Sequence, residues 1–176
     1  MRHSPIPEVG AILLGLAAYV ALTGWLVVLQ VFAGLLLVWG GASTPIEPSS
    51  SDPLVRQLVG VVVFFASGYV TGRASEESPM LNAALLGVVL YALVTLFYRV
   101  LWIAFDLDVP VDFAYEFSRL ARAVLAAFVG GTAAQWHMRT GGAKRVSLRE
   151  LPRKNRGALF VLAILPFVFL ALTFRP

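Results

Sequence analysis

The chain has 176 residues, 59% of them apolar and 14% charged, with a formal net charge of +4. Soluble domains are about half apolar and about a quarter charged, so this composition is typical of an integral membrane protein and leaves no room for a separate soluble domain. The sequence contains no cysteine, which excludes disulfides, thiol catalysis and thiolate metal sites. Half of the Lys and Arg residues lie in one loop between apolar segments, at residues 139–156, so we do not expect nucleic-acid binding.

Five apolar runs dominate the sequence. A run of about 18 or more mostly apolar residues predicts a membrane-spanning helix. The predicted spans are residues 9–39, 54–71, 81–105, 117–138 and 157–174. We therefore expect an all-α fold in which residues 1–176 form a single transmembrane domain, a bundle of five transmembrane helices.

The first run, residues 9–39, is longer than a span needs. The apolar core of a signal peptide has about 7–15 residues, so this run is interpreted as a retained span. As a helix it is about 46 Å long at about 1.5 Å per residue, whereas the hydrocarbon core is about 30 Å thick. The helix must therefore tilt, project beyond the membrane, or bend near Gly24.

The second and third runs are separated by a short turn at residues 75–79, which predicts a hairpin. Small residues at steps of three or four allow membrane helices to pack closely. The residues expected to do so are Gly68, Gly72, Ala84, Gly87, Ala126, Gly130 and Ala134. An alternative interpretation makes these stripes a substrate path or a partner-binding groove. The third span carries a polar and aromatic face that suits such a path, formed by Tyr91, Thr95, Tyr98 and Trp102.

The connection between the third and fourth spans is acidic and is flanked by arginines at the expected membrane boundary. Charged groups at this depth are able to reach the headgroups, or to pair with each other. One hypothesis is a charge network on the outer side, formed by Arg99, Arg119, Arg122, Asp106, Asp108, Asp112 and Glu116. The alternatives are three independent interfacial arginines, or an anion-binding mouth.

Lys and Arg concentrate in the connection 139–156, while residues 40–53 and 106–116 contain neither. Basic residues favour the cytoplasmic side, so we expect a cytoplasmic N-terminus and an outer C-terminus. The basic loop either only fixes this orientation, or also attracts anionic lipid headgroups or docks an acidic partner. Its basic residues are Lys144, Arg145, Arg149, Arg153, Lys154 and Arg156. The fifth span lacks a continuous small-residue stripe, so we expect it to face lipid or another protein, with a mild kink at Pro166.

No known catalytic motif is found in the sequence. His137 and His3 have no carboxylate cluster nearby, so no metal site is predicted, and His137 is interpreted as an interfacial residue. We expect no cofactor.

Residues 67–73, which read Ser-Gly-Tyr-Val-Thr-Gly-Arg, precede residues 82–87, which read Asn-Ala-Ala-Leu-Leu-Gly. Together they resemble a glycine-rich hairpin ending in Gly-Arg that occurs in small, uncharacterised multi-pass proteins of the bacterial inner membrane. That resemblance implies a bacterial cytoplasmic (inner) membrane location and no particular activity. The chain length is also similar to that of the substrate-binding subunits of vitamin importers, which generally have six spans where this chain shows five.

These features favour two functions over a third, an enzyme acting on lipid or peptide, which the absence of known motifs weakens without excluding. The first is a non-enzymatic accessory or scaffold subunit of a membrane complex, or a homo-oligomer, which the lack of catalytic motifs and the small-residue stripes favour. The second is a small transporter or channel component that binds a small molecule between spans one to four. A water-accessible cavity reaching Tyr91 or Thr95 is the observation that favours the second.

Overall fold

The computed structural model describes residues 8–39, 53–104, 112–141, 161, 164–166 and 168. Within residues 8–141 the described segments form four helices in chain order: α1 (Val9–Trp39), α2 (Pro53–Ala74), α3 (Pro79–Ala104) and α4 (Phe113–Arg139). The described part is all-helical, as the sequence predicted. The described residues of the predicted fifth span are helical, while the rest of that span and the basic connection beyond Gly141 lie outside the described residues.

Three of the described helices contain segments long and apolar enough to cross a membrane: Val9–Ala33, Gln57–Ala74 and Pro79–Ala104. This observation supports the prediction of a membrane protein. Helix α4, which contains the predicted span 117–138, is not among the three. Its first turns carry Glu116, Arg119 and Arg122. The apolar stretch that follows, residues 123–136, is roughly 21 Å long, which is less than the hydrocarbon core of about 30 Å.

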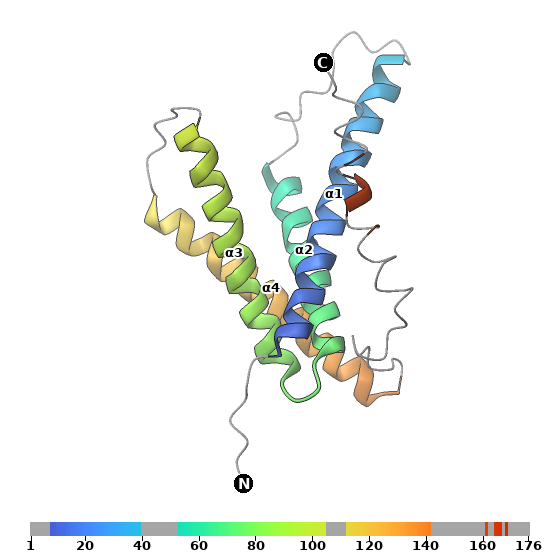
Figure 1. Cartoon of the computed structure of the whole chain (residues 1–176), viewed down its shortest axis with the longest axis vertical. Coiled ribbons are helices and arrows are strands. Elements are labelled where there is room, and N and C mark those ends of the chain that lie inside the picture. Colours follow the sequence, from blue (N-terminus) through green and yellow to red (C-terminus); the bar gives the residue numbers. More distant parts are fainter. Residues whose placement is uncertain are drawn as a thin grey trace.

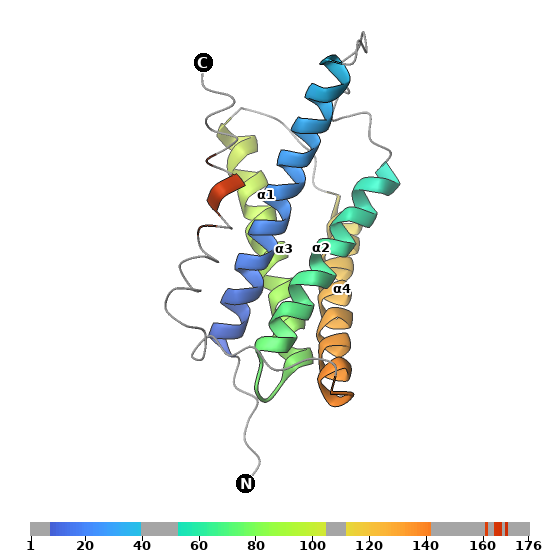
Figure 2. The same ribbon diagram turned by 90° about the vertical axis from the view of Figure 1, so that its right-hand side faces the viewer.

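Helices α2 and α3 form a hairpin through residues 75–78, and each begins with a proline, a residue that suits the first position of a helix. Figure 1 shows that the two helices diverge from this turn, with α4 crossing behind them. Helix α1 packs mainly against α2. It is one uninterrupted helix that extends past the ends of α2 and α3 in both views (Figures 1 and 2), so it does not break near Gly24.

Glycines allow the backbones of α2 and α4 to touch. A Cβ atom added to Gly68 would clash with the backbone of Ala127, whose Cα would lie 2.6 Å away. A Cβ added to Gly130 would lie 2.7 Å from the backbone nitrogen of Tyr69. Real Cβ atoms do not approach backbone so closely, so each of these two positions requires glycine for this packing.

The Tyr69 hydroxyl adds a polar contact between α2 and α4. It lies 2.6 Å from Nδ1 of His137, within hydrogen-bond distance. The position of His137 at a helix end predicted an interfacial residue, and no sequence pattern predicted Tyr69 as its partner.

Helix α4 also packs closely against α3. A Cβ added to Gly87 would lie 2.8 Å from the Cα atom of Val124. The predicted packing residues are buried, apart from Ala84. Ala84 is half-buried because the neighbouring Ala83 occupies the contact instead, within reach of Gly131.

The start of α1 is held by the turn between α2 and α3. The Glu8 carboxylate accepts hydrogen bonds from the backbone N–H groups of Glu76 (2.8 Å) and Glu77 (3.0 Å) and from the side-chain amide of Asn82 (3.2 Å). Asn82 is fully buried, accepts from the Glu8 backbone N–H and donates to Ser75 Oγ at 3.1 Å. We call Glu8, Ser75, Glu76, Glu77 and Asn82 the N-terminal clamp.

Candidate functional site

A pocket of about 610 Å³ lies at the end of the bundle away from the α2–α3 turn, and all four described helices contribute to it. We call it the four-helix pocket. Its lining residues are Tyr19 of α1; Gln57, Gly60, Val61 and Phe64 of α2; Tyr91, Val94, Tyr98 and Trp102 of α3; and Asp112, Tyr115, Glu116, Arg119 and Arg122 at the start of α4.

Helix geometry explains why these residues meet. Those of each helix recur at steps of one, three or four, so they share one face. Near the turn, the facing helices carry small residues such as Gly68, Gly72 and Gly87 and pack in close contact. Toward the other end, aromatic side chains replace them and the helices diverge (Figure 1). Gly60 leaves further space, because a Cβ atom added there would meet nothing within 4 Å.

A carboxylate with two partners lies at the centre of the pocket. The Tyr91 hydroxyl donates a hydrogen bond of 2.7 Å to Oε2 of Glu116. Arg119 forms an ion pair with the same carboxylate, at 3.3 Å from Oε1. The Arg119 guanidinium also lies 5.7 Å from the centre of the Tyr115 ring, within the range of a cation–π contact. Glu116 therefore links α3 to α4 and neutralises one of the two pocket arginines.

The second carboxylate of the pocket has a local role. Oδ1 of Asp112 accepts hydrogen bonds from the backbone N–H groups of Ala114 (3.0 Å) and Tyr115 (3.2 Å), so Asp112 is the N-cap of α4. Arg122 donates from Nε to the backbone carbonyl of Ser118 at 3.2 Å. Within the described parts of the chain the single ion pair is that of Arg119 with Glu116, so Arg122 has no carboxylate partner there.

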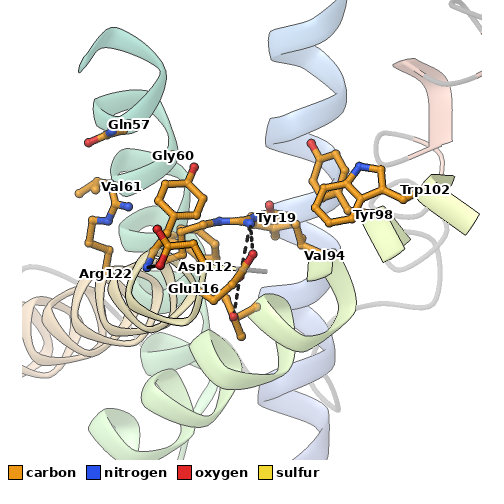
Figure 3. Close-up of a pocket in the computed structure, with 14 residues that line it drawn as sticks. Tyr19, Gln57, Gly60, Val61, Val94, Tyr98, Trp102, Asp112, Glu116 and Arg122 are labelled. Carbon is orange, nitrogen blue, oxygen red and sulfur yellow. Dashed lines mark hydrogen bonds and ion pairs between the residues drawn. The ribbon is translucent and has the colours of Figure 1, made fainter. Parts of the chain in front are cut away.

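The pocket has two chemically different sides. Figure 3 shows Arg122 of α4 beside α2, near Gln57 and Val61, with Tyr98 and Trp102 of α3 on the far side. The rings of Tyr98 and Trp102 pack with their centres 6.4 Å apart.

A second pair of rings, Tyr19 and Phe64, has its centres 5.3 Å apart and joins α1 to α2. The pocket therefore has aromatic surface on several walls, with Arg122 beside α2 and the Tyr98–Trp102 pair on the far side.

The structure brings together only part of the predicted charge network. Arg119, Arg122, Asp112 and Glu116 all line the pocket. Arg99 does not: its guanidinium lies 5.3 Å from the centre of the Trp102 ring, one turn along the same helix. Asp106 and Asp108 lie outside the described residues, as do Lys144, Arg145, Arg149, Arg153, Lys154 and Arg156 of the basic loop.

The polar and aromatic face of the third span meets the pocket along most of its length. Tyr91, Tyr98 and Trp102 line it, whereas Thr95 does not, although the Thr95 hydroxyl is buried. The sequence analysis did not assign Gln57 or Gly60 to a site. The sequence feature that could have pointed to them is their spacing, which places Gln57 and Gly60 on one face of the second span with Val61 and Phe64.

Comparisons with known proteins add no further identification. No protein-family model matches the chain, and no curated protein or solved structure matches it either. Among the described residues, no group of three or more His, Cys, Asp or Glu side chains is placed to hold a metal ion. The functional assignment therefore depends on the geometry of the pocket.

Proposed function

We propose that this protein is a small multi-pass membrane protein that binds a small molecule in the four-helix pocket, as a transporter or channel component. The observation that carries the proposal is a pocket reaching Tyr91, the feature that distinguishes this function from that of an accessory subunit. Its volume of about 610 Å³ is within the range of about 300–1,000 Å³ typical of small-molecule sites.

The composition of the lining supports the same conclusion. Small-molecule sites are mainly apolar and aromatic with a few polar groups that fix orientation. Here Glu116, Arg119 and Arg122 converge on a pocket whose other walls are largely aromatic.

The membrane arrangement that we propose has five spans, with the N-terminus in the cytoplasm of a bacterial cell. Arg119 and Arg122 then lie at the outer boundary, where α4 begins, and the four-helix pocket opens to the outside. The basic loop lies on the cytoplasmic face against anionic lipid. In this arrangement α4 spans as part of the bundle, with its charged first turns in the headgroup region and its small-residue face against α2 and α3.

Native mass spectrometry of the gently extracted protein tests the proposal. We expect the wild-type protein to carry a small molecule that is absent from Gly60→Phe, because the new ring fills open space in the pocket. Val62→Phe is the matched control on the same helix, because Val62 is 63% exposed and does not line the pocket. A stoichiometric protein partner, with no small molecule, would instead favour the accessory-subunit function.

A further inference from the structure

The charges of the four-helix pocket narrow the class of ligand. Of its two carboxylates, Glu116 is paired with Arg119 and bonded to Tyr91, and Asp112 caps α4. Of its two arginines, Arg122 makes one hydrogen bond, from Nε to a backbone carbonyl, and has no carboxylate partner among the described residues. The guanidinium group has further donors in a fork that fits a carboxylate, phosphate or sulfonate.

A cationic ligand fits the same pocket poorly. Aromatic rings attract cations, but two of the pocket's rings already make cation–π contacts with the protein's own arginines. Arg119 lies over Tyr115, and Arg99 lies over Trp102. A bound cation would compete for these rings and would lie close to Arg119 and Arg122, with which it shares its sign of charge.

The remaining walls indicate an apolar body on the ligand. Val61, Phe64, Val94 and Tyr98 present aliphatic and aromatic surface. In Figure 3 Val61 lies beside Arg122, whereas the aromatic wall of α3, formed by Tyr98 and Trp102, lies at the opposite side of the pocket.

We infer that the ligand is an amphipathic anion, whose acidic group binds Arg122 and whose apolar body lies against the aromatic wall of α3. This inference rests on the proposed function, because it assumes that the four-helix pocket holds a ligand. An organic acid and an anionic lipid share this chemistry, and the experiment distinguishes them.

The test compares three naphthalene probes of similar shape: 2-naphthoate, 2-naphthylmethanol and 2-naphthylmethylammonium. Binding to the full-length protein in phosphatidylcholine nanodiscs is measured by equilibrium dialysis, with empty nanodiscs subtracted. We expect naphthoate to bind about tenfold more tightly than either other probe, and Arg122→Gln to remove that preference. Arg139→Gln is the matched control, because it makes the same charge change on an exposed residue at the other end of α4.

Two further variants separate the possible failures. Arg122→Lys keeps the positive charge and should keep a weaker preference for naphthoate, even where Arg122→Gln fails to fold. If Arg122→Gln binds naphthoate as the wild type does while Gly60→Phe binds none, the ligand class is wrong and the pocket remains a site. If Gly60→Phe binds all three probes normally, the proposed function fails as well.

Replacing part of the phosphatidylcholine with phosphatidylglycerol identifies the source of the anion. An anionic lipid that occupies the pocket should weaken naphthoate binding to the wild type by competition. Unchanged naphthoate binding would assign the site to a soluble organic acid.

Discussion

At the scale of single residues, the N-terminal clamp is a set of polar contacts that joins three segments of the described chain. Glu8 satisfies two backbone N–H groups of a tight turn and one buried side chain, so a single carboxylate joins the first helix to the hairpin. The contributions of its partners differ, because the N–H groups of Glu76 and Glu77 are exposed to solvent, whereas Asn82 is fully buried. Water is able to replace the first two contacts but not the third.

Replacing Asn82 should therefore cost more stability than replacing Glu8. Asn82→Ala removes a donor and an acceptor from a buried site, which costs about 1–3 kcal/mol in the free energy of unfolding. Glu8→Gln keeps the shape of the side chain and loses its charge, so its cost should be smaller. Glu77→Gln is the control, because it is the same Glu-to-Gln substitution as Glu8→Gln. It lies in the turn that Glu8 binds, and Glu77 contributes its backbone N–H, not its side chain, to the clamp. Reversible unfolding in mixed micelles measures all three, and equal costs for Glu77→Gln and Asn82→Ala would contradict this account.

At the scale of elements, glycine positions determine where the helices touch and where they separate. Gly68 and Gly130 lie in backbone contact across α2 and α4, whereas Gly60, two turns earlier on α2, faces the open pocket. The same residue type therefore has opposite roles along one helix. A membrane offers little hydrophobic gain for helix association, so close packing of this kind carries much of the stability.

A single methyl group should distinguish these roles. Gly68→Ala places a Cβ atom against the backbone of Ala127 and should destabilise the fold by about 1–3 kcal/mol. Gly60→Ala meets no atom within 4 Å and should be neutral or slightly stabilising, since alanine is the better helix former. The two substitutions are chemically identical and lie on one helix. Similar unfolding midpoints for both variants would show that α2 and α4 do not pack as described.

Sequence patterns predicted the elements better than their contacts. Apolar run length located the four described helices, and spacing by three or four identified most of the packing glycines, because both signals are local to one helix. Which residues of a neighbouring helix a given helix face contacts depends on how both helices are rotated about their own axes. That is why Ala83 replaced Ala84 at the contact with α4, and why Arg99 contacts the Trp102 ring without lining the pocket itself. The bond from Glu8 to Asn82 joins residues 74 apart, and no local pattern predicts it.

At the scale of the whole molecule, the helices are joined closely near the α2–α3 turn and are spread at the other end, where the pocket lies (Figure 1). If the N-terminus is cytoplasmic, the pocket faces outward and the turn faces inward. The two ends of the bundle are then exposed to different compartments.

The cysteine-free sequence makes this orientation directly measurable. A membrane-impermeant thiol reagent added outside intact cells should label Val94→Cys in the pocket and should not label Glu77→Cys in the turn. Glu77→Cys should react only after the inner face is exposed. Leu96 is 62% exposed. In the proposed arrangement it faces lipid, so Leu96→Cys should resist the reagent from both sides. Labelling of Val94→Cys only from the inside would reverse the proposed topology.

The N-terminal clamp also constrains how the protein is made. Its Glu8 carboxylate binds a backbone group 68 residues further along the chain. A ribosome adds about 5–20 residues per second, so roughly 3–14 s pass between synthesis of Glu8 and synthesis of its partner. In the bundle Gly15 lies against Thr71 of α2 and Leu86 of α3, and during that interval α3 has not yet been made. The first helix must therefore remain in the lipid, or in contact with the insertion machinery, until α2 and α3 have been synthesised and inserted beside it.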